Sequence, residues 1–225
     1  MPININGNIS DALSQDPYYV VISSKDVELD EQAKISFDVL KGSFRKLERQ
    51  PGDGVKRGFG FCEFSYDDGT FQLKEKTGLY KQMPSLPIEV LSQDFLDGNS
   101  TKSLGNSFLD DIIQSTAKHL PTGIDTAYVI KLMMAGYDVY MEEFPVHRDM
   151  VDYTVTYLID KVDVAGGVLR LHKEKKEGTV FKEIDMTNPM DGLFFRDDKM
   201  FHSVTELNIT QEGGHRDIII LGFKG

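Results

Sequence analysis

The chain has 225 residues, 40% hydrophobic and 27% charged, which fits one large folded domain rather than a disordered segment. Its formal net charge of −11 argues against nucleic acid and anionic membranes as partners, because an acidic surface repels both. Cys62 is the single cysteine, which excludes an internal disulfide. The sequence shows neither a secretion signal nor an apolar run of the ~20 residues that cross a bilayer. We therefore expect a cytoplasmic protein.

The first half of the chain mixes two periodicities. Apolar residues between positions 30 and 47 recur as in an amphipathic helix, and a second helix is predicted over 106–119. Between them, residues 56–64 and 70–74 have strand composition on either side of the turn Asp67-Asp68-Gly69. We expect these elements, in about residues 1–125, to support the rest of the domain.

The second half is a series of short segments rich in β-branched and aromatic residues, separated by turn residues such as Gly166-Gly167. Strands are predicted at 127–134, 153–159, 167–172, 179–181, 192–195, 202–207 and 217–223. Many short strands after a helical first half favour a mainly β fold with flanking helices over a doubly wound sheet. The predicted fold is a double-stranded β-helix (jelly roll, cupin-like) with its core in about residues 126–225, in a single domain spanning 1–225.

Three residues of the second half form a candidate metal site. His147 and Asp149 are separated by one residue, and on an extended chain the side chains of residues i and i+2 project from the same face. His202 follows within another predicted strand. Two imidazoles and one carboxylate hold one face of a metal ion and leave the other face open, as in non-haem iron(II) oxygenases. A His-x-Asp pair alone also occurs by chance on protein surfaces, so the prediction depends on the order and spacing of all these residues.

Arg216 begins an otherwise apolar predicted strand, fourteen residues after His202. An arginine that points inward from such a strand needs an anionic partner. The C5 carboxylate of 2-oxoglutarate would satisfy the guanidinium in bidentate geometry, whereas a surface ion pair with an acid such as Asp217 is the alternative. The pattern predicts an enzyme that uses Fe(II), 2-oxoglutarate and O2, with no catalytic residue beyond the iron centre.

Four segments follow one another in an order typical of a known family. They are Pro145-Val146-His147-Arg148-Asp149, Val164-Ala165-Gly166-Gly167, Asp197–Thr205 and Gly214–Ile218. The chain resembles the bacterial 2-oxoglutarate/Fe(II)-dependent dioxygenases that include the L-isoleucine 4-hydroxylases. The resemblance implies a double-stranded β-helix and hydroxylation of an unactivated C–H bond in a small molecule, with a free L-amino acid as the expected substrate.

Lys131 is the candidate substrate-binding residue. It stands in an apolar segment, Val129–Met134, where the family carries a His-Gln-x-Arg-like sequence. If the side chain enters the pocket, the carboxylate of an amino acid is its natural partner. The alternative is a solvated lysine on the outer face of the strand.

Other interpretations of the sequence remain open. Residues 56–64, KRGFGFCEF, match the octapeptide of RNA-recognition motifs, although the acidic composition opposes an RNA-binding module. A metal-dependent cupin enzyme that does not use 2-oxoglutarate is a second alternative, against which Arg216 argues. His172 competes as a metal ligand, but its neighbours Arg170, Lys173 and Lys175 indicate a solvated strand end.

Overall fold

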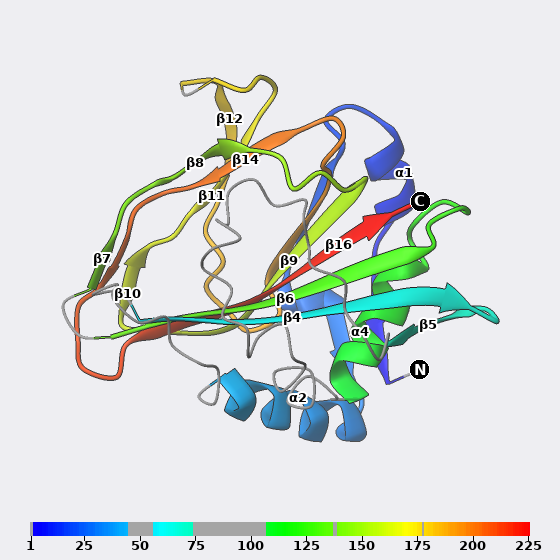
Figure 1. The fold of residues 1–225 in the computed structure, drawn as a ribbon, viewed down its shortest axis with the longest axis horizontal. Coiled ribbons are helices and arrows are strands. Elements are labelled where there is room, and N and C mark those ends of the chain that lie inside the picture. The colour runs from blue at the N-terminus through cyan, green and yellow to red at the C-terminus, as the bar shows by residue number, and fades with distance from the viewer. Residues whose placement is uncertain (1, 45–55, 74–106, 137–138, 177) are drawn as a thin grey trace.

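A seven-stranded antiparallel sheet is the largest element of the computed structural model, which describes residues 2–44, 56–73, 107–136, 139–176 and 178–225 (Figure 1). In spatial order its strands are β2 (Tyr19–Ile22), β13 (Gly192–Arg196), β9 (Tyr153–Val162), β16 (His215–Lys224), β6 (Thr126–Ala135), β4 (Lys56–Asp67) and β5 (Thr70–Leu73). Strands β2, β4 and β5 come from the first half of the chain, so both halves contribute to one sheet.

Two smaller antiparallel sheets, of four and three strands, accompany the large sheet. The four-stranded sheet has the order β12 (Val180–Ile184), β11 (Leu169–His172), β14 (Phe201–Val204) and β8 (Phe144–His147). The three-stranded sheet has the order β10 (Val164–Gly166), β15 (Leu207–Ile209) and β7 (Val139–Met141). In Figure 1 these strands lie across from the large sheet. The predicted mainly β jelly roll with flanking helices is confirmed.

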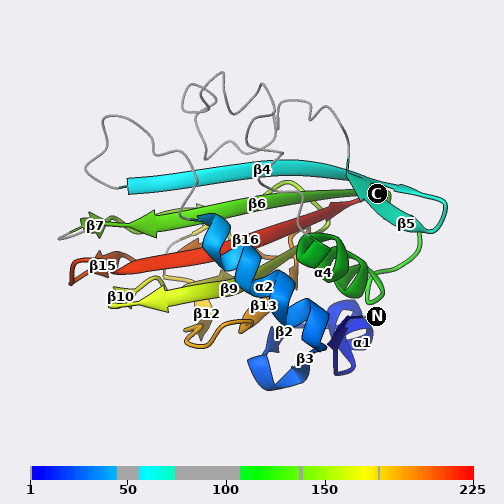
Figure 2. The ribbon, with the colours of Figure 1, turned by 90° about the horizontal axis from the view of Figure 1, so that it is seen from below.

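The helices cover the other face of the large sheet (Figure 2). They are α2 (Glu31–Ser43) and α4 (Ser107–Ala117), while α1 (Ile9–Ser14), the 3-10 turn η1 (Ser24–Asp26) and the pair β1 (Ile3–Ile5) and β3 (Val27–Leu29) lie beside them. Asp30 begins α2, because its side chain accepts a hydrogen bond from the backbone N–H of Ala33 at 2.8 Å. No helix in the described ranges is long and apolar enough to cross a bilayer.

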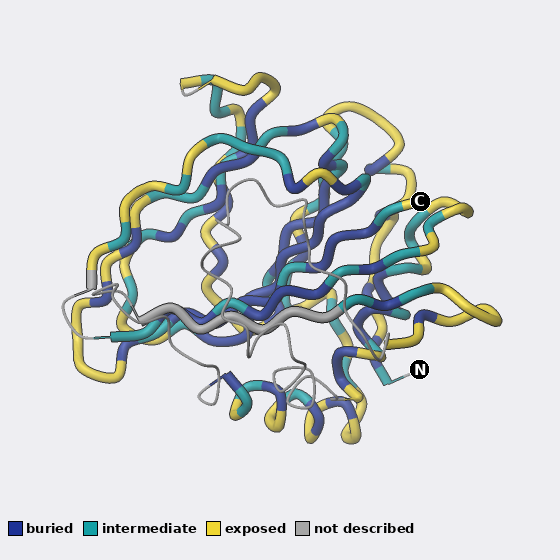
Figure 3. The backbone as a smooth tube through the Cα atoms, in the orientation of Figure 1, coloured by how far each residue is buried: buried dark blue, intermediate teal, exposed yellow. Residues whose placement is uncertain are grey.

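Side-chain alternation divides the core into two layers. On β9 and β16, Tyr157 and Ile219 pack with the helix layer, whereas Leu158 and Ile218 pack toward the smaller sheets. The central strands are therefore buried on both faces, as the dark blue tubes in Figure 3 show. This double burial explains why the sequence of β9 is a nearly continuous run of strand-forming residues.

Two predicted elements differ from the structure. The strand expected over 202–207 is two strands, β14 and β15, which belong to different sheets. The chain changes sheet at Thr205, whose hydroxyl accepts a hydrogen bond from the Val168 amide at 3.0 Å. The helix expected to reach residue 47 ends at Ser43, and residues 45–47 lie outside the described part of the chain.

The segment that matches the RNA-recognition octapeptide is part of β4. This strand pairs with β6 from Lys56 to Ser65, and its end, Phe64–Asp67, pairs with β5, the last strand of the seven-stranded sheet. An RNA-recognition motif presents its aromatics on a four-stranded sheet. The octapeptide match therefore reflects strand composition in a different fold.

Candidate active site

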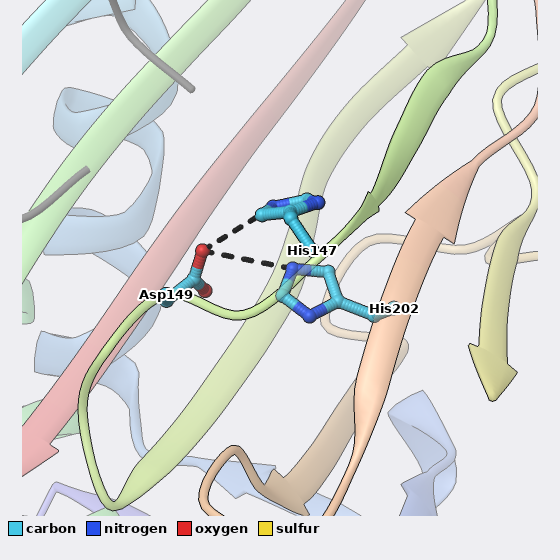
Figure 4. A group of neighbouring side chains, drawn as sticks. All are labelled: His147, Asp149 and His202. Atoms are coloured by element: carbon cyan, nitrogen blue, oxygen red, sulfur yellow. Dashed lines mark ion pairs between the residues drawn. The ribbon is translucent and has the colours of Figure 1, made fainter. Parts of the chain in front are cut away.

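His147, Asp149 and His202 converge from two paired strands and a loop (Figure 4). His147 ends β8 and lies opposite His202 of β14, with 4.1 Å between the ring centroids. Asp149 Oδ1 lies 3.4 Å from His147 Nε2 and 3.6 Å from His202 Nε2. The three atoms that face one another are thus His147 Nε2, His202 Nε2 and Asp149 Oδ1.

His147 and Asp149 lie close together for a different reason from the one that the sequence predicts. The strand ends at His147, so strand alternation does not place Asp149. A loop turns the chain instead, with Met150 at φ 65°, a left-handed conformation that non-glycine residues rarely adopt. The expectation that both side chains project from one strand was wrong in its geometry, although the two side chains do meet.

The charge states of His202 and Asp149 favour metal coordination, whereas the neighbouring Asp149 carboxylate raises the pKa of His147 against the effect of burial. Burial lowers the pKa of His202 to about 4, so this imidazole is neutral and available as a ligand at neutral pH. Burial opposes the charged form of Asp149, yet the neighbouring His202 and His147 lower its pKa below the ordinary value. His147 Nδ1 lies 2.8 Å from the carbonyl oxygen of Pro145, so a proton on Nδ1 leaves Nε2 to face Asp149.

Two further polar residues surround Asp149. The Thr154 hydroxyl donates to Asp149 Oδ2 at 3.2 Å. The buried Asp197 carboxylate accepts from the backbone N–H of Asp149 and of Met150, and its pKa is raised to about 7 by burial and by the charge of Asp149. Sequence analysis did not find Asp197, because Asp197-Asp198 has the composition of a turn. Its place at the start of the segment Asp197–Thr205, which carries the family resemblance, was an available indication.

The three donors open onto an elongated pocket between the large sheet and the smaller sheets. The pocket is partly open to solvent, and most of its wall is apolar, with Ile130, Leu132 and Met134 from β6. Two charged side chains outside the donor group line it, Arg216 and the exposed Glu142.

Arg216 is the second residue of β16, and its side chain lines this pocket. The residue is only 2% exposed. Within the described residues its guanidinium forms no hydrogen bond and no ion pair, so the alternative of a surface ion pair with Asp217 is not what the structure shows. Burial lowers its pKa to about 10, which leaves the side chain positively charged at neutral pH.

Gly166 and Gly167 make room for this arrangement. Both have positive φ values, and a Cβ on Gly166 would lie 2.1 Å from the carbonyl oxygen of Glu206. A Cβ on Gly167 would lie 3.4 Å from Cδ and Nε of Arg216. The second glycine is therefore a point where the backbone closely approaches the arginine.

Lys131 is not in the pocket. Ile130 and Leu132 line the cavity, so Lys131 projects from the opposite face of β6, under α2. It is fully buried there, where Nζ donates to Ser43 Oγ at 2.5 Å and lies 4.8 Å from the centre of the Phe44 ring. The predictions of a substrate-binding lysine and of a solvated lysine were both wrong, because a helix covers the outer face of this strand.

His172 is also placed differently from the expectation. It is 1% exposed rather than solvated, and its Nε2 lies 2.9 Å from the Ser203 hydroxyl. The His147–Asp149–His202 group does not include it.

A second set of potential ligands, Asp160, His215 and Asp217, lies on the helix-covered face. Asp160 Oδ2 is 2.9 Å from Lys41 Nζ of α2 and 2.9 Å from His215 Nε2. Because a lysine already contacts this carboxylate, the geometry is that of an ion-pair network that joins α2 to the sheet.

Comparisons with known proteins place the site in context. Residues 145–222 match the model of a family described as 2OG-Fe dioxygenase, and no curated protein sequence matches the chain. Solved structures that resemble it include IDO from Bacillus thuringiensis, with 16% identity and a TM-score of 0.70 over 96% of this chain and 93% of that one. The Fe(II)/α-ketoglutarate-dependent dioxygenase TqaL has 14% identity and a TM-score of 0.63, covering 96% and 84%. A bsmA homolog from Methylobium petroleophilum has 18% identity and a TM-score of 0.62, covering 98% and 94%. At these identities the likeness shows the shared fold.

The family match includes the three donors and Arg216, from the loop with His147 and Asp149 to the strand with Arg216. The donor set within it has two imidazoles and one carboxylate, the chemistry that holds iron(II) with an open face. The chain is accordingly an enzyme of the 2OG-Fe dioxygenase type, an oxidoreductase whose cofactors are iron(II), 2-oxoglutarate and dioxygen.

Proposed function

We propose that the enzyme hydroxylates an unactivated C–H bond of a free L-amino acid, with iron(II) bound by His147 Nε2, Asp149 Oδ1 and His202 Nε2. Arg216 pairs with the C5 carboxylate of 2-oxoglutarate. When bound, the iron supplies the oxidising chemistry, and the protein supplies orientation and a pocket from which water is excluded.

One observation carries this proposal: a buried, charged arginine that forms no ion pair within the described residues faces the same cavity as the three donors. An isolated buried cation is costly, and an anionic ligand removes that cost. A planar guanidinium suits a carboxylate in particular, because two parallel hydrogen bonds form. A cupin enzyme that does not use 2-oxoglutarate has no need for this residue.

The amino-acid substrate is supported by the family resemblance and by the charges that remain in the pocket. Once Arg216 is paired with 2-oxoglutarate, Glu142 is the charged group on the described wall outside the donor set. Its carboxylate suits an ammonium group, and the apolar wall suits a hydrocarbon side chain. A small molecule with a free amine and an aliphatic body fits both features.

The test is a succinate-release assay of the purified protein with iron(II), ascorbate and 2-oxoglutarate. Each free L-amino acid is compared with its N-acetyl derivative, which lacks the ammonium group. We expect at least one free amino acid to stimulate succinate release well above the rate without substrate, with formation of a product heavier by one oxygen atom. Its N-acetyl derivative should be inactive.

Two histidine variants provide the controls for the ligand assignment. His202→Ala should abolish both metal binding and turnover, whereas His172→Ala should retain metal binding, although it loses stability because Ser203 loses its partner. Loss of activity in His172→Ala with retention in His202→Ala would show that the ligand set is wrong. A protein that binds iron(II) but consumes no 2-oxoglutarate with any substrate would favour the cupin alternative.

A further inference from the structure

We infer that Asp197 is a positioning residue that holds two of the three proposed metal ligands, Asp149 and His202, in position relative to each other. This inference rests on the proposed ligand set. Asp197 follows β13 and is 0% exposed, and it contacts both the loop that carries Asp149 and the ring of His202.

The first contact is with the backbone beside Asp149. Asp197 Oδ1 accepts from the Asp149 N–H at 3.0 Å, and Oδ2 accepts from the Met150 N–H at 2.9 Å. Met150 has the left-handed conformation that turns the chain after β8. A carboxylate that accepts from two successive amides stabilises this turn, and the turn aims the Asp149 side chain at the two imidazoles.

A backbone contact in the other direction locks the two segments together. The Asp197 N–H donates to the carbonyl oxygen of Asp152 at 3.0 Å. The segment around Asp197 is therefore fixed to both ends of the loop between β8 and β9. Movement of Asp197 would be transmitted to Asp149.

The second contact is with His202. Asp197 Oδ1 lies 3.7 Å from His202 Nδ1, and this buried nitrogen has no hydrogen-bond partner within the described residues. Coordination through Nε2 leaves the proton on Nδ1, where it needs an acceptor. The Asp197 carboxylate is the anion that this proton faces, and it fixes the tautomer and the ring orientation of His202.

Replacement by asparagine removes the acceptor capacity while conserving size. Two amide donors and one imidazole donor converge on Asp197, and the single amide oxygen of asparagine cannot satisfy all three. Asp198→Asn is the matched control, because Asp198 is the next residue and its carboxylate pairs with Arg196 at 2.9 and 2.7 Å, away from the site.

The experiment uses Co(II), which is stable in air, as the probe in place of iron(II). We expect Asp197→Asn to weaken Co(II) binding on the order of tenfold to a hundredfold, the range found when an outer partner of a metal ligand is removed. Asp198→Asn should bind Co(II) within about twofold of the wild-type protein. The melting temperature of each metal-free protein is measured in parallel, so that a loss of affinity is not confused with unfolding.

Proton NMR of the Co(II) protein tests the contact with His202 directly. The wild-type spectrum should contain two exchangeable imidazole N–H signals shifted by the metal, one from each histidine. The signal from His147, which faces the Pro145 carbonyl, is an internal reference. In Asp197→Asn the second signal should disappear or exchange faster with solvent while the reference signal stays.

Each outcome separates this inference from the proposed function. Tight Co(II) binding by Asp197→Asn with both signals retained would overturn the role of Asp197 and leave the ligand set intact. A wild-type spectrum with a single exchangeable signal would overturn it even if the variant did not fold. Failure of the wild-type protein to bind Co(II) would instead contradict the ligand assignment.

Discussion

The guanidinium of Arg216 is enclosed by apolar side chains and by the close approach of Gly167. Its hydrogen-bonding geometry, more than its charge, determines which ligand it selects, because a planar fork matches a carboxylate at two points. A lysine at this position would keep the positive charge, but its ammonium group cannot form the two parallel hydrogen bonds that a guanidinium forms with a carboxylate. Substitution between these two cations therefore tests the role of Arg216.

We predict that Arg216→Lys reduces the apparent affinity for 2-oxoglutarate on the order of tenfold to a thousandfold, because a charge-assisted pair in a desolvated pocket is worth a few kcal/mol. The affinity for the proposed amino-acid substrate, measured with saturating 2-oxoglutarate, should change much less. The measurement is the 2-oxoglutarate dependence of succinate release. Arg196→Lys is the control, because Arg196 pairs with Asp198 outside the pocket. An unchanged 2-oxoglutarate constant would remove Arg216 from the site.

Among the secondary-structure elements, β6 shows most clearly how one strand serves two environments. Its even-numbered residues Ile130, Leu132 and Met134 face the cavity, and its odd-numbered residues Val129 and Met133 pack with the helix layer. Lys131 is part of the second series and interacts with α2 through Ser43. The strand therefore separates residues that line the pocket from residues that anchor the helix.

For this reason we predict that Lys131→Met leaves the Michaelis constants for substrate and for 2-oxoglutarate within about twofold of the wild-type values, since a group outside the pocket contributes little to binding. Its effect should appear as a changed free energy of unfolding in urea. Leu132→Ala, one position along the same strand, should raise the Michaelis constant of the substrate, because Leu132 lines the pocket. A large increase of the substrate constant in Lys131→Met would contradict the side-chain direction described here.

The same strand shows what sequence alone could and could not predict. The alternation that groups Lys131 with Val129 and Met133 follows from the two-residue period of a strand. Which of the two faces is the pocket does not follow, because both faces are buried: one by α2 and one by the smaller sheets. The three proposed metal donors were predicted from their residue types and order, and the structure brings them together. Asp197 instead contacts backbone amides, which no spacing rule identifies.

In the molecule as a whole, a polar network attaches the helix layer to the sheet. Lys41 of α2, Asp160 of β9 and His215 of β16 meet at one carboxylate oxygen. The Asp160 side chain is 12% exposed, whereas Lys41 is 41% exposed, so solvent screens part of the attraction. Burial opposes the charge on Asp160, yet its hydrogen bonds with His215 and Lys41 lower its pKa below the ordinary value of 3.8.

A lowered pKa in the folded state means that ionised Asp160 stabilises the fold above about pH 4, and that this contribution is lost as the pH falls through the folded-state pKa. We predict that Asp160→Asn lowers the free energy of unfolding on the order of 1 kcal/mol at pH 7. The difference between variant and wild type should shrink below about pH 4. Urea unfolding at a series of pH values measures it. Asp185→Asn disrupts the pair with Lys161, in which the Asp185 side chain is 53% exposed, and should have a smaller effect at pH 7. A pH-independent difference for Asp160→Asn would refute the assignment.

The two-faced construction of the large sheet also has a consequence for altering the enzyme by directed evolution. Positions 130, 132, 134, 218 and 220 border the cavity, while positions 129, 133, 219 and 221 belong to the core under the helices. A combinatorial library confined to the first set changes the shape of the substrate chamber and leaves the helix-side packing intact. In a library built from consecutive positions, about every second varied position would lie in the core under the helices. Substitutions there would destabilise the protein. The periodicity of two neighbouring strands thus defines which small part of sequence space is worth screening for new substrates.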